Sequence, residues 1–235
     1  MGEFWKDSLA TLIAYLDRFK DTQFSIFDTP LHYNFKEASD GGVSYDLRKI
    51  FEDTLVQARP LDSATLVDNH DTQPGEALES FIGFTFKPLA YALILFREQG
   101  YPCVFLGDLD GISGGGEGDD GKVEPMSQLA DFIKIRKLFS YGKTRDYYDH
   151  PNCLGWIREG DEDHKNGCAI VICNGTEEGS KRMQVPDGHA GEIWTDVLGW
   201  SKGEVTIGED VSKCKLQFNV TNLIYTGMDR VQMST

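Results

Sequence analysis

The sequence has no run of 18 or more apolar residues, which is the length that a membrane-spanning helix needs. Its first residues lack a basic segment followed by an apolar run, so we expect no secretory signal. Positive charge is scarce, because 23 Lys and Arg stand against 38 Asp and Glu, a formal net charge of −15. Such a chain repels phosphate backbones and anionic lipid, so we expect neither nucleic acid nor a membrane as a partner. Solubility alone would also explain the acidity.

Cysteine is sparse and shows no C-x-x-C spacing. The five cysteines stand at positions 103, 153, 168, 173 and 214. An odd number cannot all pair within one chain. We therefore expect buried thiols in a reducing compartment, which favours a cytoplasmic location.

Apolar patterns in the first half of the chain alternate between two periods. Spacings of three and four residues predict helices, and short apolar runs closed by polar residues predict buried strands. The predicted helices are 6–20, 46–58, 87–99 and 124–140, and the predicted strands are 24–27, 64–67 and 101–106. Alternating strands and helices indicate a parallel sheet with crossover helices, an α/β fold. The stretch 107–121 is so rich in glycine that we expect a mobile loop there.

The pattern changes near Tyr141 to short apolar segments separated by Gly, Asn and Asp. Regular short strands with turn signals are typical of an antiparallel β-sandwich. The predicted strands are 154–158, 168–173, 181–185, 191–196, 204–207 and 215–220. We therefore predict two domains, 1–141 and 142–235.

Polar residues and aromatics follow the predicted strands of the first half, in the segments 2–5, 27–32 and 68–74. In parallel α/β architectures the carboxyl ends of the strands carry the active site. Carboxylates beside aromatics suit glycoside chemistry, because sugar rings stack on aromatic faces and acetal cleavage uses paired carboxyl groups. A network of helix caps and turns explains the same residues almost as well.

Five segments together resemble the alpha-amylase superfamily of glycoside hydrolases, with the greatest likeness to liquefying bacterial amylases and intracellular fungal alpha-amylases. They are GEFW at 2–5, FDTPLHYNF at 27–35, VDNHDTQPG at 67–75, FKPLAYALILFREQGYPCVFLGD at 86–108 and DYYDHPNCLGWIREGD at 146–161. The resemblance runs over nearly the whole chain. It implies the C-terminal half of a (β/α)8 TIM-type barrel, followed by an antiparallel β-sandwich.

The resemblance also assigns roles to residues. Glu3 matches the general acid/base, and Asp71 matches the third carboxylate, which binds sugar hydroxyls and stabilises the transition state. His70 matches the histidine that hydrogen-bonds the sugar at the cleavage point. The remaining positions assigned to substrate binding are Phe4, Trp5 and Gln73.

Family members act with retention of configuration, which requires a nucleophilic carboxylate. In the family this nucleophile lies in a G-x-R-x-D motif, which these 235 residues do not contain. We therefore expect a fragment of an enzyme that cleaves α-1,4-glucosidic bonds in starch, glycogen or maltooligosaccharides, inactive by itself. The alternative is a non-catalytic module that binds glucan or a partner protein.

The resemblance places the calcium of full-length family members on residues upstream of this sequence, so we expect no cofactor and no metal within the chain. It also implies that the barrel strands present here are too few to close a barrel. Sheet edges would then be open, and we expect possible self-association through them.

Overall fold

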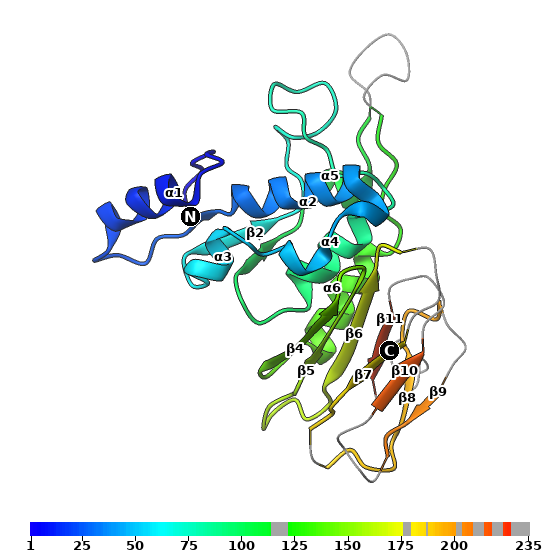
Figure 1. Ribbon diagram of the computed structural model, residues 1–235. Coiled ribbons are helices and arrows are strands. Elements are labelled where there is room, and N and C mark those ends of the chain that lie inside the picture. The colour runs from blue at the N-terminus through cyan, green and yellow to red at the C-terminus, as the bar shows by residue number, and fades with distance from the viewer. Residues whose placement is uncertain are drawn as a thin grey trace. The chain divides into compact units, whose positions relative to one another are not determined.

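The computed structural model describes residues 1–113, 122–175, 180–186, 188–200, 204–208, 214–217 and 223–226 (Figure 1). Contacts group the chain into two compact units, and each is described by itself. Unit 1 comprises 1–45, 49–94 and 99–130, and unit 2 comprises 46–48, 95–98 and 131–235. Residues 131–141 thus group with unit 2, whereas the predicted domain division follows residue 141 and stays a prediction.

Unit 1 contains the predicted parallel sheet. Its strands are β1 (Ile26–Phe27), β2 (Ser63–Leu66) and β3 (Tyr101–Cys103), in the order β1-β2-β3. Both neighbouring pairs are parallel. Every residue of β2 is buried, as expected for a central strand that is covered on both faces. The prediction of a parallel sheet is confirmed; β1 and β3 are shorter than predicted, and β2 has the predicted length but begins one residue earlier.

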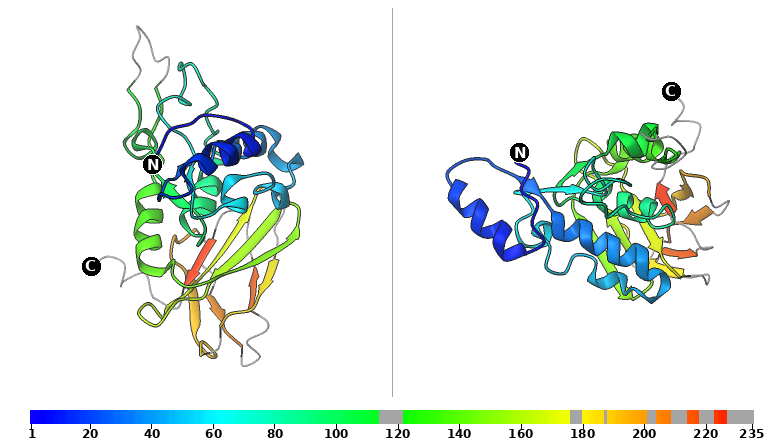
Figure 2. Two further views of the ribbon diagram at one scale, coloured as in Figure 1. Left: turned by 90° about the vertical axis from the view of Figure 1, so that its left-hand side faces the viewer. Right: turned by 90° about the horizontal axis from the view of Figure 1, so that it is seen from above.

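Helices precede, connect and follow these strands. They are α1 (Leu9–Leu16), α2 (Thr29–Gly41), α3 (Leu55–Ala58), α4 (Lys87–Leu95) and α5 (Leu106–Asp110), with 3₁₀ turns η1 (Asp17–Phe19), η2 (Gly42–Ser44) and η3 (Leu47–Lys49). Figure 2 shows α1 and α2 as separate helices at the N-terminal end of the chain. Among the described residues, no helix is long and apolar enough to cross a membrane.

Three predictions for the first half of the chain were wrong. The predicted helix 46–58 is not continuous: only η3 and the short α3 lie in this stretch, with turns at 50–53 between them. Helix α2 occupies a stretch in which no helix was predicted; Asp28 caps it, and the Asp28 carboxylate accepts a hydrogen bond from the Leu31 backbone N–H at 3.2 Å. The predicted strand 101–106 ends at Cys103, and α5 lies where strand and loop were predicted. The remainder of the predicted glycine-rich loop, residues 114–121, lies outside the described residues.

Unit 2 is built mainly from antiparallel strands, as predicted, and also holds most of helix α6 (Leu129–Phe139). One sheet has the order β4-β5-β6-β11-β8-β9, and β10 pairs with β7. The strands are β4 (Thr144–His150), β5 (Cys153–Arg158), β6 (Cys168–Cys173), β7 (Ser180–Met183), β8 (Ile193–Asp196), β9 (Glu204–Thr206), β10 (Cys214–Gln217) and β11 (Leu223–Thr226). Strands β4 and β11 were not predicted.

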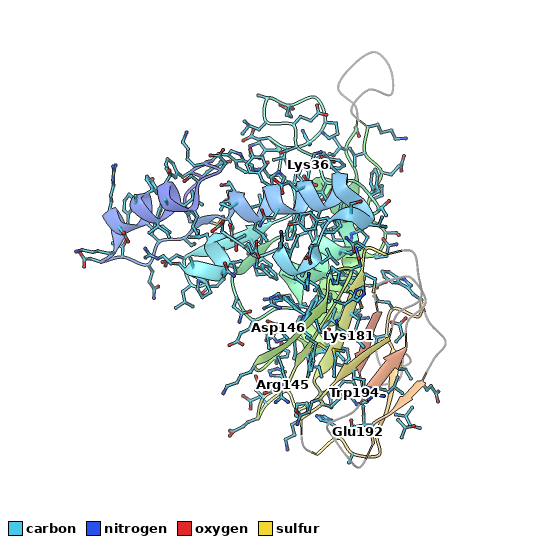
Figure 3. The ribbon with its side chains drawn as sticks, in the orientation of Figure 1. Lys36, Arg145, Asp146, Lys181, Glu192 and Trp194 are labelled. Carbon is cyan, nitrogen blue, oxygen red and sulfur yellow. The ribbon has the colours of Figure 1, made fainter. Side chains whose placement is uncertain are left out.

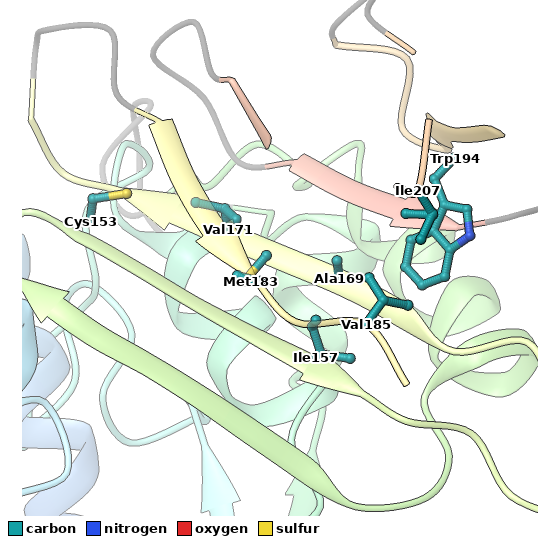
Figure 4. Close-up of a cluster of buried hydrophobic side chains, with 8 residues drawn as sticks. All are labelled: Cys153, Ile157, Ala169, Val171, Met183, Val185, Trp194 and Ile207. Carbon is teal, nitrogen blue, oxygen red and sulfur yellow. The ribbon is translucent and has the colours of Figure 1, made fainter. Parts of the chain in front are cut away.

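A cluster of apolar side chains forms a core of unit 2 (Figure 4). Ile157 on β5 and Val171 on β6 meet Met183 on β7, so the cluster joins the large sheet to the smaller pair. Trp194 on β8 is fully buried in the same cluster. Burying an aromatic or aliphatic side chain of this size contributes about 1.5–3 kcal/mol. The cluster therefore accounts for the packing of the short strands.

Polar side chains of unit 2 form ion pairs along the strands. Arg97 donates to both carboxylate oxygens of Asp146 on β4, at 2.6 and 3.0 Å. Arg145, which precedes Asp146 on β4, pairs with Glu159. Figure 3 labels Arg145 and Asp146. Adjacent strand residues point to opposite faces, so the two pairs lie on different sides of the sheet.

Candidate functional site at the carboxyl ends of the parallel strands

A pocket of about 350 Å³ lies in unit 1, where the three parallel strands end. It is lined by Met1, Gly2, Glu3, Phe27, Leu66, Asp68, Asn69, His70, Cys103, Val104, Phe105 and Leu106. Gly2 forms a parallel bridge with Ile26 of β1, and its N–H donates to the Ser25 carbonyl at 2.8 Å. This pairing holds Glu3 at the same edge of the sheet as the residues that follow β2.

Glu3, His70 and Asp71 come together at this edge. One side-chain ligand atom of each residue lies within 4.8 Å of those of the other two. His70 Nε2 lies 3.5 Å from Asp71 Oδ1. Glu3 and His70 are exposed and Asp71 is half-buried, so a ligand can reach all three from solvent. The structure thus assembles the two predicted catalytic carboxylates with the predicted sugar-binding histidine.

The loop that presents His70 and Asp71 is fixed by its own side chains. Asn69 Oδ1 accepts the backbone N–H groups of Asp71 at 2.9 Å and Thr72 at 3.0 Å. The Thr72 hydroxyl donates to Asp68 Oδ1 at 3.1 Å. Such Asx turns let a short polar side chain replace backbone partners. These bonds fix the backbone from Asp68 to Thr72.

A buried charge cluster lies behind this loop. The Lys87 ammonium pairs with Asp68 at 2.9 Å and with Asp108, and the Tyr91 hydroxyl donates to Asp108 at 2.6 Å. Lys87 also lies 3.4 Å above the ring of Phe81. Two carboxylates share one ammonium, and burial raises the pKa of Asp68 to about 6. Sequence reasoning missed this cluster, although Lys87 sits alone among apolar residues in α4, an unusual place for a lysine.

The other residues predicted to bind substrate do not line the pocket. Phe4 stacks on Tyr15 with ring centroids 4.1 Å apart, and both rings pack against an apolar cluster that includes Leu12 of α1. Trp5 donates from its indole N–H to the Tyr33 hydroxyl at 3.0 Å. The Gln73 side-chain amide donates to the exposed carboxylate of Glu76 at 3.5 Å. For Phe4, Trp5 and Gln73 substrate binding stays a prediction that the geometry of the pocket does not support.

Two polar residues after β1 serve the fold. Asp28 is buried and accepts backbone N–H groups of α2 and α3, including that of Val56 at 2.6 Å, and burial raises its pKa. His32 is buried as well, with Nδ1 2.6 Å from the Val67 carbonyl, and burial lowers its pKa to about 4. A neutral imidazole therefore donates to Val67 at ordinary pH. For the segment 27–32, the predicted network of caps and turns is confirmed.

The fold and the pocket together define an α/β protein with a carboxylate and histidine site at the carboxyl ends of its parallel strands. No protein-family model matches the chain. The chain is 46% identical to glucan 1,4-alpha-maltohexaosidase of Bacillus sp. (strain 707) over 210 residues, and 44% identical to an alpha-amylase of Bacillus licheniformis over 215 residues. Each match covers 89% of this chain.

Among solved structures, an alpha-amylase from Geobacillus thermoleovorans in complex with acarbose matches 96% of this chain and 52% of its own, with a TM-score of 0.66 at 17% identity. The homologues of this chain are alpha-amylases, and the chain matches their C-terminal portion. It spans 39–40% of the length of the two curated relatives.

Proposed function

We propose that these 235 residues are the C-terminal part of a retaining alpha-amylase-type enzyme that cleaves α-1,4-glucosidic bonds in starch, glycogen or maltooligosaccharides. The observation that carries the proposal is the convergence of Glu3, His70 and Asp71 within 4.8 Å at the pocket. Glu3 lies 67 positions before His70 in the sequence, and the fold brings it to the adjacent pair His70 and Asp71. Their chemistry is that of a sugar-cleaving site.

Each residue has a defined part in the proposed reaction. Glu3 protonates the glycosidic oxygen as it leaves, and then takes a proton from the attacking water. Asp71 accepts hydrogen bonds from sugar hydroxyls, and these bonds strengthen as positive charge develops on the ring. His70 donates to a hydroxyl of the same ring. The nucleophile belongs to a part of the enzyme that these residues do not include.

The arrangement of strands in each unit also supports this proposal. We propose that β1, β2 and β3 correspond to the last three strands of a TIM-type barrel and that the antiparallel sheets of unit 2 form its C-terminal sandwich. The parallel order of unit 1 and the shared apolar cluster of unit 2 support both parts. A calcium site on upstream residues is part of the same proposal.

A second candidate is a non-catalytic module that binds glucan or a partner protein. It is favoured by one observation, the absence of a G-x-R-x-D motif from these residues. Under this proposal the pocket holds sugar without cleaving it, and Glu3 and Asp71 only accept hydrogen bonds.

A fusion protein separates the two candidates. It joins this chain to the N-terminal part of the Bacillus licheniformis alpha-amylase, the part that this chain does not match. We expect the chain alone to release no reducing ends from soluble starch and the joined protein to do so at about 1–1000 per second, the range of ordinary enzymes. Glu3→Gln and Asp71→Asn should each abolish this activity, while Gln73→Ala, the control, should keep it. Activity of the chain alone would contradict the proposal that the nucleophile lies outside these residues. More than a tenth of the rate in either variant would remove that residue from the catalytic set.

A further inference from the structure

Two cysteines of unit 2 face each other across adjacent antiparallel strands. Cys153 opens β5, and its partner in the register is Cys173, the last residue of β6. Directly opposite residues point to the same face of a sheet. Cys153 is buried in the apolar cluster of unit 2 (Figure 4), and the half-buried Cys173 packs against the same cluster.

The hydrogen bonds next to the two cysteines show which kind of pair they form. The Asn174 N–H donates to the Asn152 carbonyl at 3.2 Å, and these residues are the next opposite pair along the ladder. In antiparallel sheets, hydrogen-bonded and non-hydrogen-bonded pairs alternate. Cys153 and Cys173 therefore form a non-hydrogen-bonded pair, the kind with Cα atoms about 4.5 Å apart. That separation lies within the range of about 4.4–6.8 Å found in disulfides.

Contacts on both sides hold the two cysteines in this register. The Asn152 amide donates to Asn174 Oδ1 at 2.9 Å, beyond the cysteines at the end of the ladder. On the other side the β5–β6 pairing continues without interruption to Arg158 opposite Cys168. The two sulfur atoms therefore cannot move apart by a simple slip of the strands.

The two thiols interact with each other and with a nearby cation. The Cys173 thiol donates to the Cys153 sulfur, which lowers the pKa of Cys153 and raises that of Cys173. The buried Lys181 ammonium, which donates to the Cys153 carbonyl at 2.7 Å, adds to the lowering. A hydrogen bond and a cation are the features that activate cysteines in redox proteins.

Burial dominates at Cys168 and Cys103. Cys168 is fully buried; its thiol donates to the Phe139 carbonyl at 3.6 Å and the Arg158 cation acts on it, but burial still raises its pKa to about 12. Burial also raises the pKa of Cys103, which lies in unit 1.

We propose that Cys153 and Cys173 form a reversible redox site, a cross-strand dithiol that low-molecular-weight disulfides oxidise to a disulfide. A thiolate of the pair attacks one sulfur of the small disulfide, which forms a mixed disulfide and releases one small thiolate. The second protein sulfur attacks the protein sulfur of that mixed disulfide and releases the other small thiolate. The dithiol loses two electrons, the small disulfide gains them, and the two protons end on the released thiols.

Glutathione buffers of graded oxidised-to-reduced ratio test the site on the purified 235-residue chain. Samples are quenched with acid, alkylated, digested with trypsin and analysed by mass spectrometry. We expect a linked pair of peptides, 146–158 joined to 166–181, which rises with the ratio and disappears with dithiothreitol. Cys168 and Cys173 share the second peptide, so fragmentation between them must place the bond at Cys173.

Variants complete the test. Cys153→Ser and Cys173→Ser should each abolish the linked peptides and leave a glutathione adduct on the remaining cysteine, whereas Cys103→Ser, the control, should leave the linkage unchanged. The wild-type peptide map does not depend on the folding of any variant. Any of three results would overturn the proposal: mixed disulfides without linked peptides at every ratio, full alkylation of both cysteines, or a bond from either cysteine to another cysteine.

Discussion

Asp68 and Lys87 carry buried charge whose balance depends on pH. Lys87 pairs with both Asp68 and Asp108, so the cluster holds one negative charge more than positive when all three are ionised. Burial raises the pKa of Asp68 from 3.8 to about 6, which means that the folded chain binds a proton there more tightly than the unfolded chain. Its contribution to stability therefore grows as pH falls through 6 and is lost as pH rises.

Asp68→Asn should remove this dependence, because the amide resembles the protonated carboxyl. We expect the free energy of unfolding of the variant, minus that of the wild type, to fall by about 1–3 kcal/mol between pH 7 and pH 4.5. Urea denaturation at several pH values measures it. His32 acts in the opposite direction: because its pKa is lowered, its contribution to stability decreases as pH falls. The informative quantity is therefore the difference in unfolding free energy between variant and wild type at each pH. The exposed Asp110→Asn serves as control, and an equal slope in both variants would contradict the role of Asp68.

The residues of the pocket show what sequence could predict at this scale. The resemblance named Glu3, His70 and Asp71, and the fold places them together. It also named Phe4 and Trp5, whose side chains pack on Tyr15 and Tyr33 instead. A motif fixes which residue types follow a strand, but the direction of a side chain depends on tertiary packing, which the motif does not contain.

Elements begin and end where single residues allow it, as helix α2 illustrates. Asp28 caps this helix, and Pro30 stands in its first turn, where a missing N–H costs nothing. The same carboxylate accepts the first N–H groups of α3 and so ties two helices to the end of β1. The signal for α2 was present in the sequence, but the Asp-Thr-Pro segment resembled a turn. The second role of Asp28, binding the N–H groups of α3, depends on residues far along the chain and could not be predicted.

The start of β4 depends on a glycine. Gly142 has a φ of +72°, and a Cβ there would lie 1.7 Å from the Gly160 carbonyl oxygen. Gly142 pairs with Gly160 in a parallel bridge, and its carbonyl accepts Arg158 Nη2 at 2.8 Å. Neither backbone can retreat without breaking these contacts.

Gly142→Ala should therefore destabilise unit 2 by about 2–4 kcal/mol, the sum of an unfavourable backbone conformation and a clash with backbone atoms. Gly191→Ala is the matched control, because its φ is +83° and a Cβ there meets nothing within 4 Å. We expect the control to cost about 1 kcal/mol. Urea denaturation followed by tryptophan fluorescence measures both. Equal losses would show that the close approach to Gly160 does not matter.

At the scale of the whole molecule, unit 1 presents a parallel sheet with open edges. Among the described residues, β3 pairs only with β2, and β1 has β2 and the single bridge to Gly2 as neighbours. Tyr101 on β3 and Leu106 after it are each 64% exposed. Unpaired strand edges beside apolar surface favour association with another chain. The net charge of −15 opposes indiscriminate aggregation but cannot satisfy the hydrogen bonds of a sheet edge.

We therefore expect the isolated 235-residue chain to self-associate, or to exchange its amide hydrogens fast in β1, β2 and β3. Size-exclusion chromatography with light scattering, together with hydrogen exchange, measures both. Tyr101→Lys should reduce association, because a charge on an edge strand opposes pairing. Leu61→Lys is the control, since Leu61 is 81% exposed but lies outside the strands, and it should leave association unchanged. A monodisperse wild-type monomer with slow exchange in all three strands would show that unit 1 is stable without further strands.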